Sequence, residues 1–320
     1  MKFRSYYSFI FIMMLFLNCH KEKLDNGEPC KALPQPEGFH TADNSEWVGR
    51  HEGTLYESVS FNPNNPDEIL ITVWGGERRL VKYNLVTKEK KDIIEIKSNC
   101  IPKWGTNDKI LFTDGYYPNS ALYMINSNGD SLKKLSSVQC NSFDWNNTGD
   151  RIVSYGFGIL SGNDYFHYFY IQDTEGNYLD SIPGGGSNLN WQFDSLITYS
   201  KDFDIYTLNP YTHEKKILIG ERASWVGFSW IDKDHILWSG DGKYYITNIQ
   251  TQENKIIKDP PPCMGYYSFS YSPALNKIIA IRREQWLIEN KGSSHIFGTR
   301  TRIVMMNLDG SEEEELDPEL

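Results

Sequence analysis

The sequence predicts an all-β protein: a six-bladed β-propeller, that is, a ring of six sheets with four antiparallel strands each. Three observations support this fold class. An aromatic residue that closes a short strand recurs at spacings of 43, 41, 46, 39 and 41 residues. A polar turn and then an apolar strand follow each of these aromatics. Long stretches of helical periodicity are absent, and a period near 40 with four strands per copy is typical of propeller blades.

The repeating unit is clearest between Trp104 and Leu135. Trp104 closes a first strand, and 109–113 and 121–125 are expected to form the second and third strands. Residues 131–135 are expected to form the fourth. Apolar runs rich in β-branched and aromatic residues and bounded by Asn, Gly and Asp indicate a meander of short strands.

The aromatics that close the first strands share one phase of the repeat: Phe61, Trp104, Trp145, Trp191, Trp230 and Tyr271. A four-stranded sheet has two apolar faces, and stacking sheets around a ring buries each face against a neighbour. We therefore expect these rings to lie between blades, where each buries roughly 150–250 Å². The alternative is that they stack on sugars or bases.

The third strand of each copy ends in an amide or acid: Asn84, Asn126, Asp173, Asn209, Asn248 and Asn307. Asn and Asp side chains accept hydrogen bonds from the backbone of their own turns. We expect this series to form turns, with metal binding as the alternative.

Three stretches resemble the TolB-type, WD-like β-propeller repeat: 271–280, 122–129 and 303–310. The resemblance covers about Ser58 to Leu316. It implies a propeller fold and does not select a function, because such propellers serve as scaffolds, receptors and enzymes.

The N-terminus predicts export. Lys2 and Arg4 precede an apolar run at 9–17, which is shorter than the roughly 20 residues of a membrane-spanning helix. The ending at Cys19 resembles a bacterial lipoprotein signal, which implies that Cys19 is acylated. Asn18 departs from the usual small residue there, and an ordinary signal with a chance cysteine is the alternative. The predicted domains are a lipoprotein signal peptide (1–18), a flexible tether (19–43) and the propeller (44–320).

These features indicate a monomer in the cell envelope that is lipid-anchored to a bacterial membrane and faces the periplasm or the exterior. The membrane contact runs through the lipid anchor only. The net charge of −10 argues against a nucleic-acid partner, because binding to phosphates depends on clustered Lys and Arg. We expect an envelope protein, a peptide or a glycan as partner.

Two copies carry insertions, one between Tyr155 and His167 and one between Arg282 and Arg302. Both insertions join second and third strands, so both are expected on one face of the ring, where long loops on a rigid scaffold commonly bind partners. The candidates for this binding face are aromatic: Trp74, Tyr116, Tyr117, Phe157, Tyr165, Trp225, Tyr266 and Trp286. The alternative is that most of them pack loops onto blades.

Beyond Cys19 the chain has Cys30, Cys100, Cys140 and Cys263, which allow two disulfides. Cys100 and Cys140 enter first strands at nearly equal phase and are candidates for one pair, which leaves Cys30 with Cys263 for the other.

No motif for a metal, a cofactor or a catalytic nucleophile occurs, so no catalytic residue is assigned. The leading hypothesis is a non-catalytic binding module. The alternative is a glycosidase or lyase that uses carboxylates on the loop-rich face: Glu77, Asp114, Asp164, Asp202, Asp204, Asp241 and Glu284. The acidic run 312–316 is expected to be a solvated outer edge.

Overall fold

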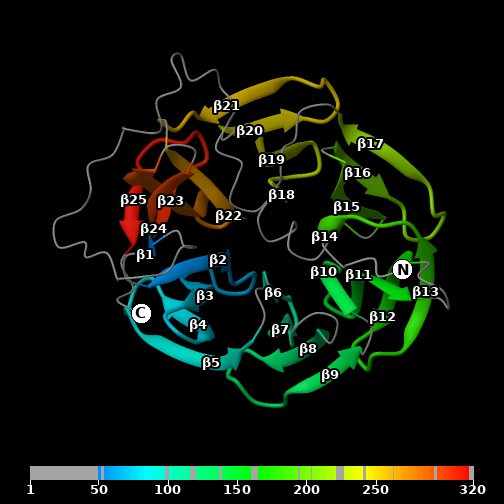
Figure 1. Ribbon diagram of the computed structural model, residues 1–320. Coiled ribbons are helices and arrows are strands. Elements are labelled where there is room, and N and C mark those ends of the chain that lie inside the picture. The colour runs from blue at the N-terminus through cyan, green and yellow to red at the C-terminus, as the bar shows by residue number, and fades with distance from the viewer. Residues whose placement is uncertain are drawn as a thin grey trace, which may run out of the picture.

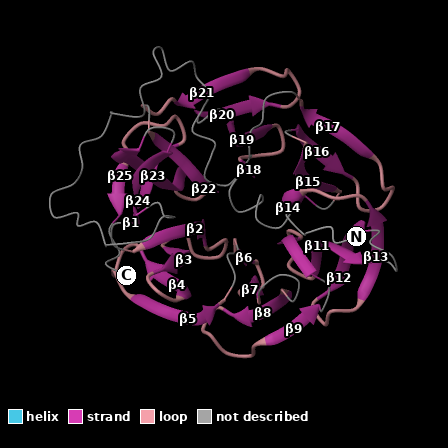
Figure 2. Cartoon of the chain, in the orientation of Figure 1, coloured by secondary structure: helices cyan, strands magenta, loops and turns pink. Residues whose placement is uncertain are grey.

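The chain forms six sheets arranged around a central axis, a six-bladed β-propeller (Figure 1). The computed structural model describes residues 50–51, 54–97, 101–115, 120–136, 139–159, 165–193, 195–202, 204–220, 227–240, 243–261, 263–291 and 294–316. These residues form strands, turns and loops and contain no helix (Figure 2). Accordingly, no helix long and apolar enough to span a membrane occurs among them.

Each blade takes its four strands from consecutive stretches of chain. Blade one contains β2 (Leu55–Phe61), β3 (Glu68–Trp74), β4 (Arg78–Asn84) and β5 (Lys90–Ile96). Blade two contains β6 (Lys103–Trp104), β7 (Lys109–Asp114), β8 (Ala121–Asn126) and β9 (Lys133–Ser136). Blade three contains β10 (Gln139–Trp145), β11 (Arg151–Ile159), β12 (Tyr165–Asp173) and β13 (Tyr178–Pro183).

The second half of the ring follows the same order. Blade four contains β14 (Ser187–Phe193), β15 (Leu196–Lys201), β16 (Asp204–Leu208) and β17 (Lys215–Ile219). Blade five contains β18 (Phe228–Trp230), β19 (His235–Gly240), β20 (Lys243–Asn248) and β21 (Asn254–Lys258). Blade six contains β22 (Met264–Ser272), β23 (Lys277–Lys291), β24 (Ser294–Asn307) and β25 (Glu314–Leu316), and β1 (Arg50–His51) joins it.

The first strand of every blade lies nearest the centre of the ring and the fourth lies at the rim (Figure 1). Neighbouring strands within each blade are antiparallel. The predicted all-β class, the blade number and the strand order are therefore confirmed. The unit predicted between Trp104 and Leu135 corresponds to β6 to β9.

The recurring aromatics lie between blades, as predicted. Trp104 packs with Leu70 of blade one, and Trp191 packs with Val153 of blade three. The indole of Trp230 donates to Thr198 Oγ1 of blade four at 2.9 Å. Each of these aromatic side chains thus packs between its own blade and the preceding one. Tyr271 is the partly buried member of the series, and its hydroxyl donates to Asn276 Oδ1 at 3.0 Å.

Blade one closes the ring by packing on blade six. Val59 and Ile71 share one apolar cluster with Ile279, Ile281 and other residues of both blades. Backbone pairing adds to this contact, because β1 runs parallel to β24 with Arg50 opposite Gly298. The last blade therefore contacts both the N-terminal strand β1 and blade one.

A repeated hydrogen bond links first strands across blades. Ser142 Oγ and Asp144 Oδ2 in blade three accept the backbone N–H groups of Leu189 and Trp191 in blade four, at 2.8 and 2.9 Å.

The same pattern occurs at the junction of the last and first blades. Ser268 Oγ and Ser270 Oγ accept the N–H groups of Val59 and Phe61, at 3.1 and 3.3 Å. In both cases the acceptors lie one and three residues before the aromatic that closes their strand. A short polar side chain at these positions therefore satisfies a backbone donor of the following blade.

The turn after the third strand follows two patterns. In blades one, four and five it reads Asn-x-x-Thr-x-Glu, and the Asn Oδ1 accepts the N–H groups two and three residues ahead. The residue after the Thr is left-handed, with φ of 63°, 60° and 60° at Lys88, His213 and Gln252. In blades two, three and six a left-handed glycine takes this role: Gly129, Gly176 and Gly310. The predicted turn-forming role of the Asn/Asp series is confirmed at Asn84, Asp173, Asn209 and Asn248.

The glycine turns also press against the preceding blade. A Cβ at Gly176 would lie 2.8 Å from the carbonyl oxygen of Leu135 in β9. A Cβ at Gly310 would lie 2.0 Å from the carbonyl oxygen of Ile257 in β21. Glycine is needed at both positions for the positive φ and for this close approach.

Candidate binding faces

Two blades extend their central hairpins beyond the ring. β11 and β12 have 9 residues each, and β23 and β24 have 15 and 14, whereas the central strands of the other blades have 5 to 7. Both extensions join second and third strands and therefore emerge on the same face. Blades three and six lie opposite each other in the ring (Figure 1). We call the surface that carries them the hairpin face.

Most of the aromatics predicted for this face lie outside the described residues. These are Tyr116, Tyr117 and Trp225, together with the side chains of Phe157 and Tyr165, whose backbones lie in β11 and β12. Trp74 ends β3 and is half-buried. The guanidinium of Arg78 lies over its ring, 5.2 Å from the centroid.

Tyr266 and Trp286 are buried, at 8% and 2% exposure, so the prediction that they form an exposed surface is wrong for these two. The hydroxyl of Tyr266 donates to Glu313 Oε2 at 2.7 Å. The ring of Trp286 lies across Gly298 on the paired strand, where a Cβ would meet the indole at 2.1 Å. Trp286 belongs to the extended hairpin itself, and it is buried because it packs against the paired strand at Gly298.

Glu284 belongs to an ion-pair network on blade six. Its carboxylate accepts hydrogen bonds from Arg282 Nε at 2.8 Å and from Arg300. Arg282 also pairs with Glu313 and Glu315, at 2.6 and 2.8 Å. With a side chain that is 5% exposed, Glu284 balances two guanidinium groups inside the blade.

Glu313 connects this network to blade five through Lys258 Nζ, 2.7 Å away. Burial alone would raise the pKa of Glu313, but hydrogen bonds from Lys258, Tyr266 and Arg282 outweigh it and hold the pKa below its usual value. The expectation of a solvated edge at 312–316 is therefore wrong for Glu313, because its carboxylate pairs with Lys258 of blade five. The period-two spacing of Arg282 with Glu284, and of Glu313 with Glu315, is the sequence signal for the network.

Two of the other carboxylates considered for an active site accept hydrogen bonds from within the fold. Asp114 Oδ1 accepts the N–H of Lys97 at 2.6 Å, and Asp204 Oδ2 accepts from the hydroxyl of Tyr206 at 3.4 Å. Asp164 and Asp241 lie outside the described residues. Within the described ranges no group of three or more His, Cys, Asp or Glu side chains could hold a metal ion.

The cysteines differ from the predicted pairing. Cys140 is a free thiol buried in β10, and burial raises its pKa to about 12. It therefore does not pair with Cys100. Cys263 is disulfide-bonded, and its partner lies outside the described residues, as do Cys19, Cys30 and Cys100. The pairing of Cys30 with Cys263 stays a prediction. Although Cys100 and Cys140 have nearly equal phase in adjacent blades, the Cys140 side chain lies in an apolar cluster with Leu111 and Ile152.

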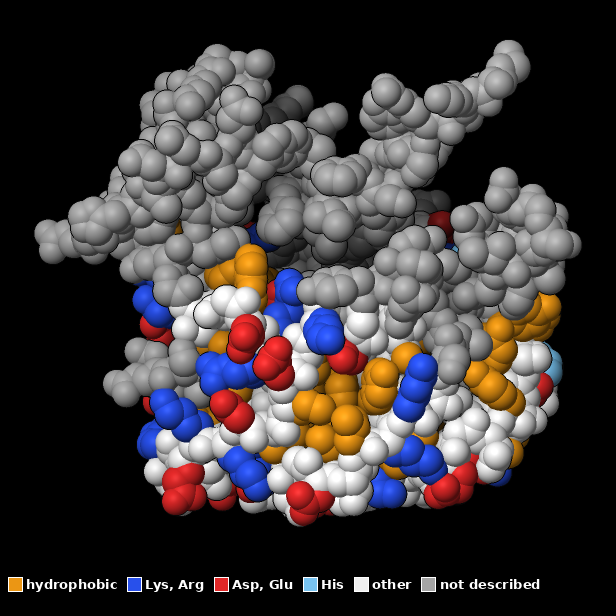
Figure 3. Space-filling view, turned by 60° about the horizontal axis from the view of Figure 1, so that its bottom comes forward, with side chains coloured by type: hydrophobic (Ala, Val, Ile, Leu, Met, Phe, Trp, Pro, Cys, Tyr) orange, Lys and Arg blue, Asp and Glu red, His pale blue; other side chains and the backbone are white. Residues whose placement is uncertain are grey.

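On the side of the molecule that Figure 3 shows, acidic and basic side chains are interspersed with hydrophobic ones. The ion pairs on the rim include Arg79 with Asp92 at 2.8 Å and Lys133 with Glu175 at 2.5 Å. No single sign of charge dominates this side of the molecule.

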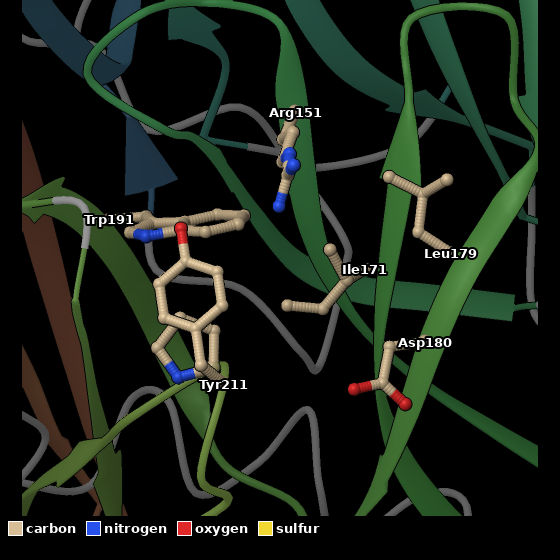
Figure 4. A pocket seen from close by; sticks show the side chains of 7 residues that line it. Arg151, Ile171, Leu179, Asp180, Trp191 and Tyr211 are labelled. Carbon is tan, nitrogen blue, oxygen red and sulfur yellow. The ribbon is translucent and has the colours of Figure 1, made fainter.

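A pocket of about 260 Å³ lies between blades three and four, at the end of the blades opposite the hairpin face (Figure 4). We call it the turn pocket. Its walls come from the start of β11, the end of β12, the start of β13, β14 and the turn after β16. The lining residues are Arg151, Ile171, Leu179, Asp180, Trp191, Pro210 and Tyr211. Sequence reasoning assigned no ligand to these residues, because a single Arg and the repeat aromatic Trp191 carry no motif.

No family model and no curated protein sequence matches this chain. Solved structures match its fold. A TolB structure from Agrobacterium tumefaciens superposes with a TM-score of 0.54 at 15% identity, over 76% of this chain and 90% of that chain. The propeller domain of the trilobed protease from Pyrococcus furiosus gives a TM-score of 0.54 at 13% identity, over 83% and 98%.

An acylaminoacyl peptidase from Pyrococcus horikoshii gives a TM-score of 0.50 at 18% identity, over 82% of this chain and 52% of that chain. The chain therefore spans about half the length of that peptidase. At these identities the similarities show the β-propeller fold, which agrees with the resemblance to the TolB-type repeat.

Proposed function

We propose that this chain is an exported, membrane-anchored β-propeller lipoprotein that acts as a non-catalytic binding module in the cell envelope. It binds a protein, peptide or glycan partner on the hairpin face. The observation that carries this proposal is the pair of extended hairpins on opposite blades. The two hairpins extend from the same face of the ring, and protruding segments on a rigid scaffold are where binding residues concentrate.

The base of the blade-six hairpin is rigid, which favours binding because less conformational entropy is lost when a partner docks. Trp286 packs across Gly298, and β1 pairs with β24 at Gly298 and Thr299. The Glu284 network lies directly below. These contacts hold the base of the hairpin in place before a partner docks.

The binding role is tested by shortening this hairpin. A variant in which Asn-Gly replaces residues 287–297 keeps the pairing of Trp286 with Gly298 and removes the extension. In membranes that hold the lipidated protein, chemical crosslinking should give partner adducts with the unaltered chain and not with the shortened one. Val86→Asn, on an exposed turn at the opposite end of blade one, is the matched control and should keep the adducts. Equal crosslinking by the shortened chain would exclude this hairpin from the binding site.

The anchor is tested separately at Cys19. Cys19→Ala should abolish incorporation of labelled palmitate and move the protein from the membrane to the soluble fraction. Two or three acyl chains are needed for stable anchoring, so loss of the acceptor cysteine is expected to release the chain fully. A variant that remains with the membrane would contradict lipid anchoring without affecting the binding proposal.

A further inference from the structure

Arg151 presents a guanidinium that forms no ion pair with a described carboxylate. It is the first residue of β11, half-buried at the wall of the turn pocket, and its side chain points into the pocket (Figure 4). Among the residues that the structure describes, no carboxylate lies within 4 Å of it, in contrast to Arg78, Arg79, Arg282, Arg300 and Arg302. A guanidinium in a pocket gains most from a bidentate carboxylate or phosphate.

Neither of the two nearest acids forms an ion pair with Arg151. Asp150 accepts hydrogen bonds from Thr148 and Asn146 in its own turn, and these bonds lower its pKa, with a smaller contribution from the charge of Arg151. Asp180 lies 2.7 Å from His213 Nε2 and accepts the N–H of Ser181 at 2.7 Å. The hydrogen-bond donors of the Arg151 guanidinium therefore lack a carboxylate from the described part of the chain, and a ligand in the pocket can supply one.

The rest of the pocket is apolar with one acidic side. Trp191 forms the floor at 1% exposure, and Ile171 lies beside it at 3%. Leu179 and Tyr211, which are 52% and 61% exposed, border the opening. Asp180 lines the side away from Arg151 (Figure 4).

We propose that the turn pocket binds the C-terminal residue of a peptide with an apolar side chain. The terminal carboxylate pairs with Arg151, and the last amide N–H is directed to Asp180. The apolar side chain packs between Leu179 and Tyr211, above the floor formed by Trp191 and Ile171. A volume of about 260 Å³ lies below the roughly 300–1,000 Å³ of typical small-molecule sites and suits one residue. Capture of a terminal carboxylate is a known mode of peptide recognition.

This site is independent of the proposed function, because it lies at the opposite end of the blades from the hairpin face. An internal acidic residue is the competing source of the carboxylate. A chain terminus fits better, because its carboxylate and amide N–H are joined through one Cα and so match an arginine and an aspartate on two sides of one small cavity.

The test is fluorescence anisotropy with three N-terminally fluorescein-labelled peptides on the full-length chain. The peptides are Gly-Gly-Gly-Leu with a free carboxylate, its C-terminal amide, and Gly-Gly-Glu-Leu amide, which carries an internal carboxylate. The free acid should bind at least tenfold more tightly than either amide, as expected for a lost charge-assisted hydrogen bond.

Arg151→Gln and Tyr211→Ala should each weaken binding of the free acid at least fivefold. Arg79→Gln, which removes an exposed blade-one arginine, should leave it unchanged. Thermal unfolding of each variant confirms the fold. Equal binding of acid and amide, unchanged binding by Arg151→Gln, or no binding of the free acid at 5 mM would overturn the proposal. Equal binding of the internal-Glu peptide would overturn the assignment to a chain terminus.

Discussion

Asp144 shows how a position between blades shifts the pKa of a single side chain. It is 9% exposed in β10, where burial raises its pKa. Lys103 Nζ at 3.9 Å and the Trp191 N–H at 2.9 Å work in the other direction and do not restore the ordinary value. The folded chain therefore holds this proton to a higher pH than the unfolded chain does.

This shift predicts a pH-dependent effect of Asp144→Asn. The contribution of Asp144 to stability is fully present below its unfolded pKa and falls as pH rises through its folded pKa, because the charged form is disfavoured in the fold. The asparagine keeps an oxygen for the Trp191 N–H and does not ionise. Urea unfolding at pH 4 and pH 7 should show the variant gaining stability relative to the unaltered chain as pH rises. A difference that is constant or reversed between the two pH values would show that Asp144 is not destabilised by ionisation.

The glycine turns allow a matched comparison. Gly310→Ala and Gly76→Ala both place a Cβ at a positive φ, 80° and 107°, which costs roughly 1 kcal/mol each. Only the Cβ at Gly310 would meet the carbonyl oxygen of Ile257, whereas nothing lies within 4 Å at Gly76. We expect Gly310→Ala to lower the free energy of unfolding by about 1–3 kcal/mol more than Gly76→Ala, measured in urea. Equal losses would mean that the turn of blade six does not press on blade five.

Local features at this scale could be predicted from sequence, and long-range ones could not. The Asn and Asp side chains accept bonds within four residues, so their role follows from turn chemistry alone. The fate of Cys140 depends on how β10 places its sulfur among residues of blade two, which repeat phase does not specify.

At the scale of elements, the ion-pair network is what distinguishes blade six. Glu284→Gln removes the almost fully buried carboxylate that pairs with both Arg282 and Arg300. Because two partly buried guanidinium groups then lose this partner, we expect a loss of about 3 kcal/mol in the free energy of unfolding. Asp92→Asn removes an exposed partner of Arg79 and should cost less than about 1 kcal/mol. Urea unfolding compares the two. Similar small losses would show that the network adds little beyond ordinary surface pairs.

The elements themselves were accessible to sequence reasoning because each strand lies between strong turn residues. The extended hairpins were also predicted, as insertions in the third and sixth copies. Their packing was not, because the burial of Trp286 depends on Gly298 lying directly opposite it in the paired strand. Exposure of an aromatic in a loop cannot be inferred before that register is known.

For the whole molecule, the ring follows from repetition: six similar sheets each need a neighbour on both faces. The closure between the last and first blades did not follow from the repeat, because it uses β1 and single serines whose partners lie about 200 residues away in sequence. The turn pocket was missed for a similar reason, since it forms only where two blades meet.

Native-state hydrogen exchange tests ring closure most directly. The N–H groups of Val59 and Phe61 donate to Ser268 and Ser270 across the junction of blades one and six. Leu189 and Trp191 make the equivalent bonds between blades three and four, which are adjacent in the chain, and serve as the internal control. We predict comparable protection for both pairs of amides. Fast exchange at Val59 and Phe61 with slow exchange at Leu189 and Trp191 would show that blades one and six do not meet, and would contradict the closed ring.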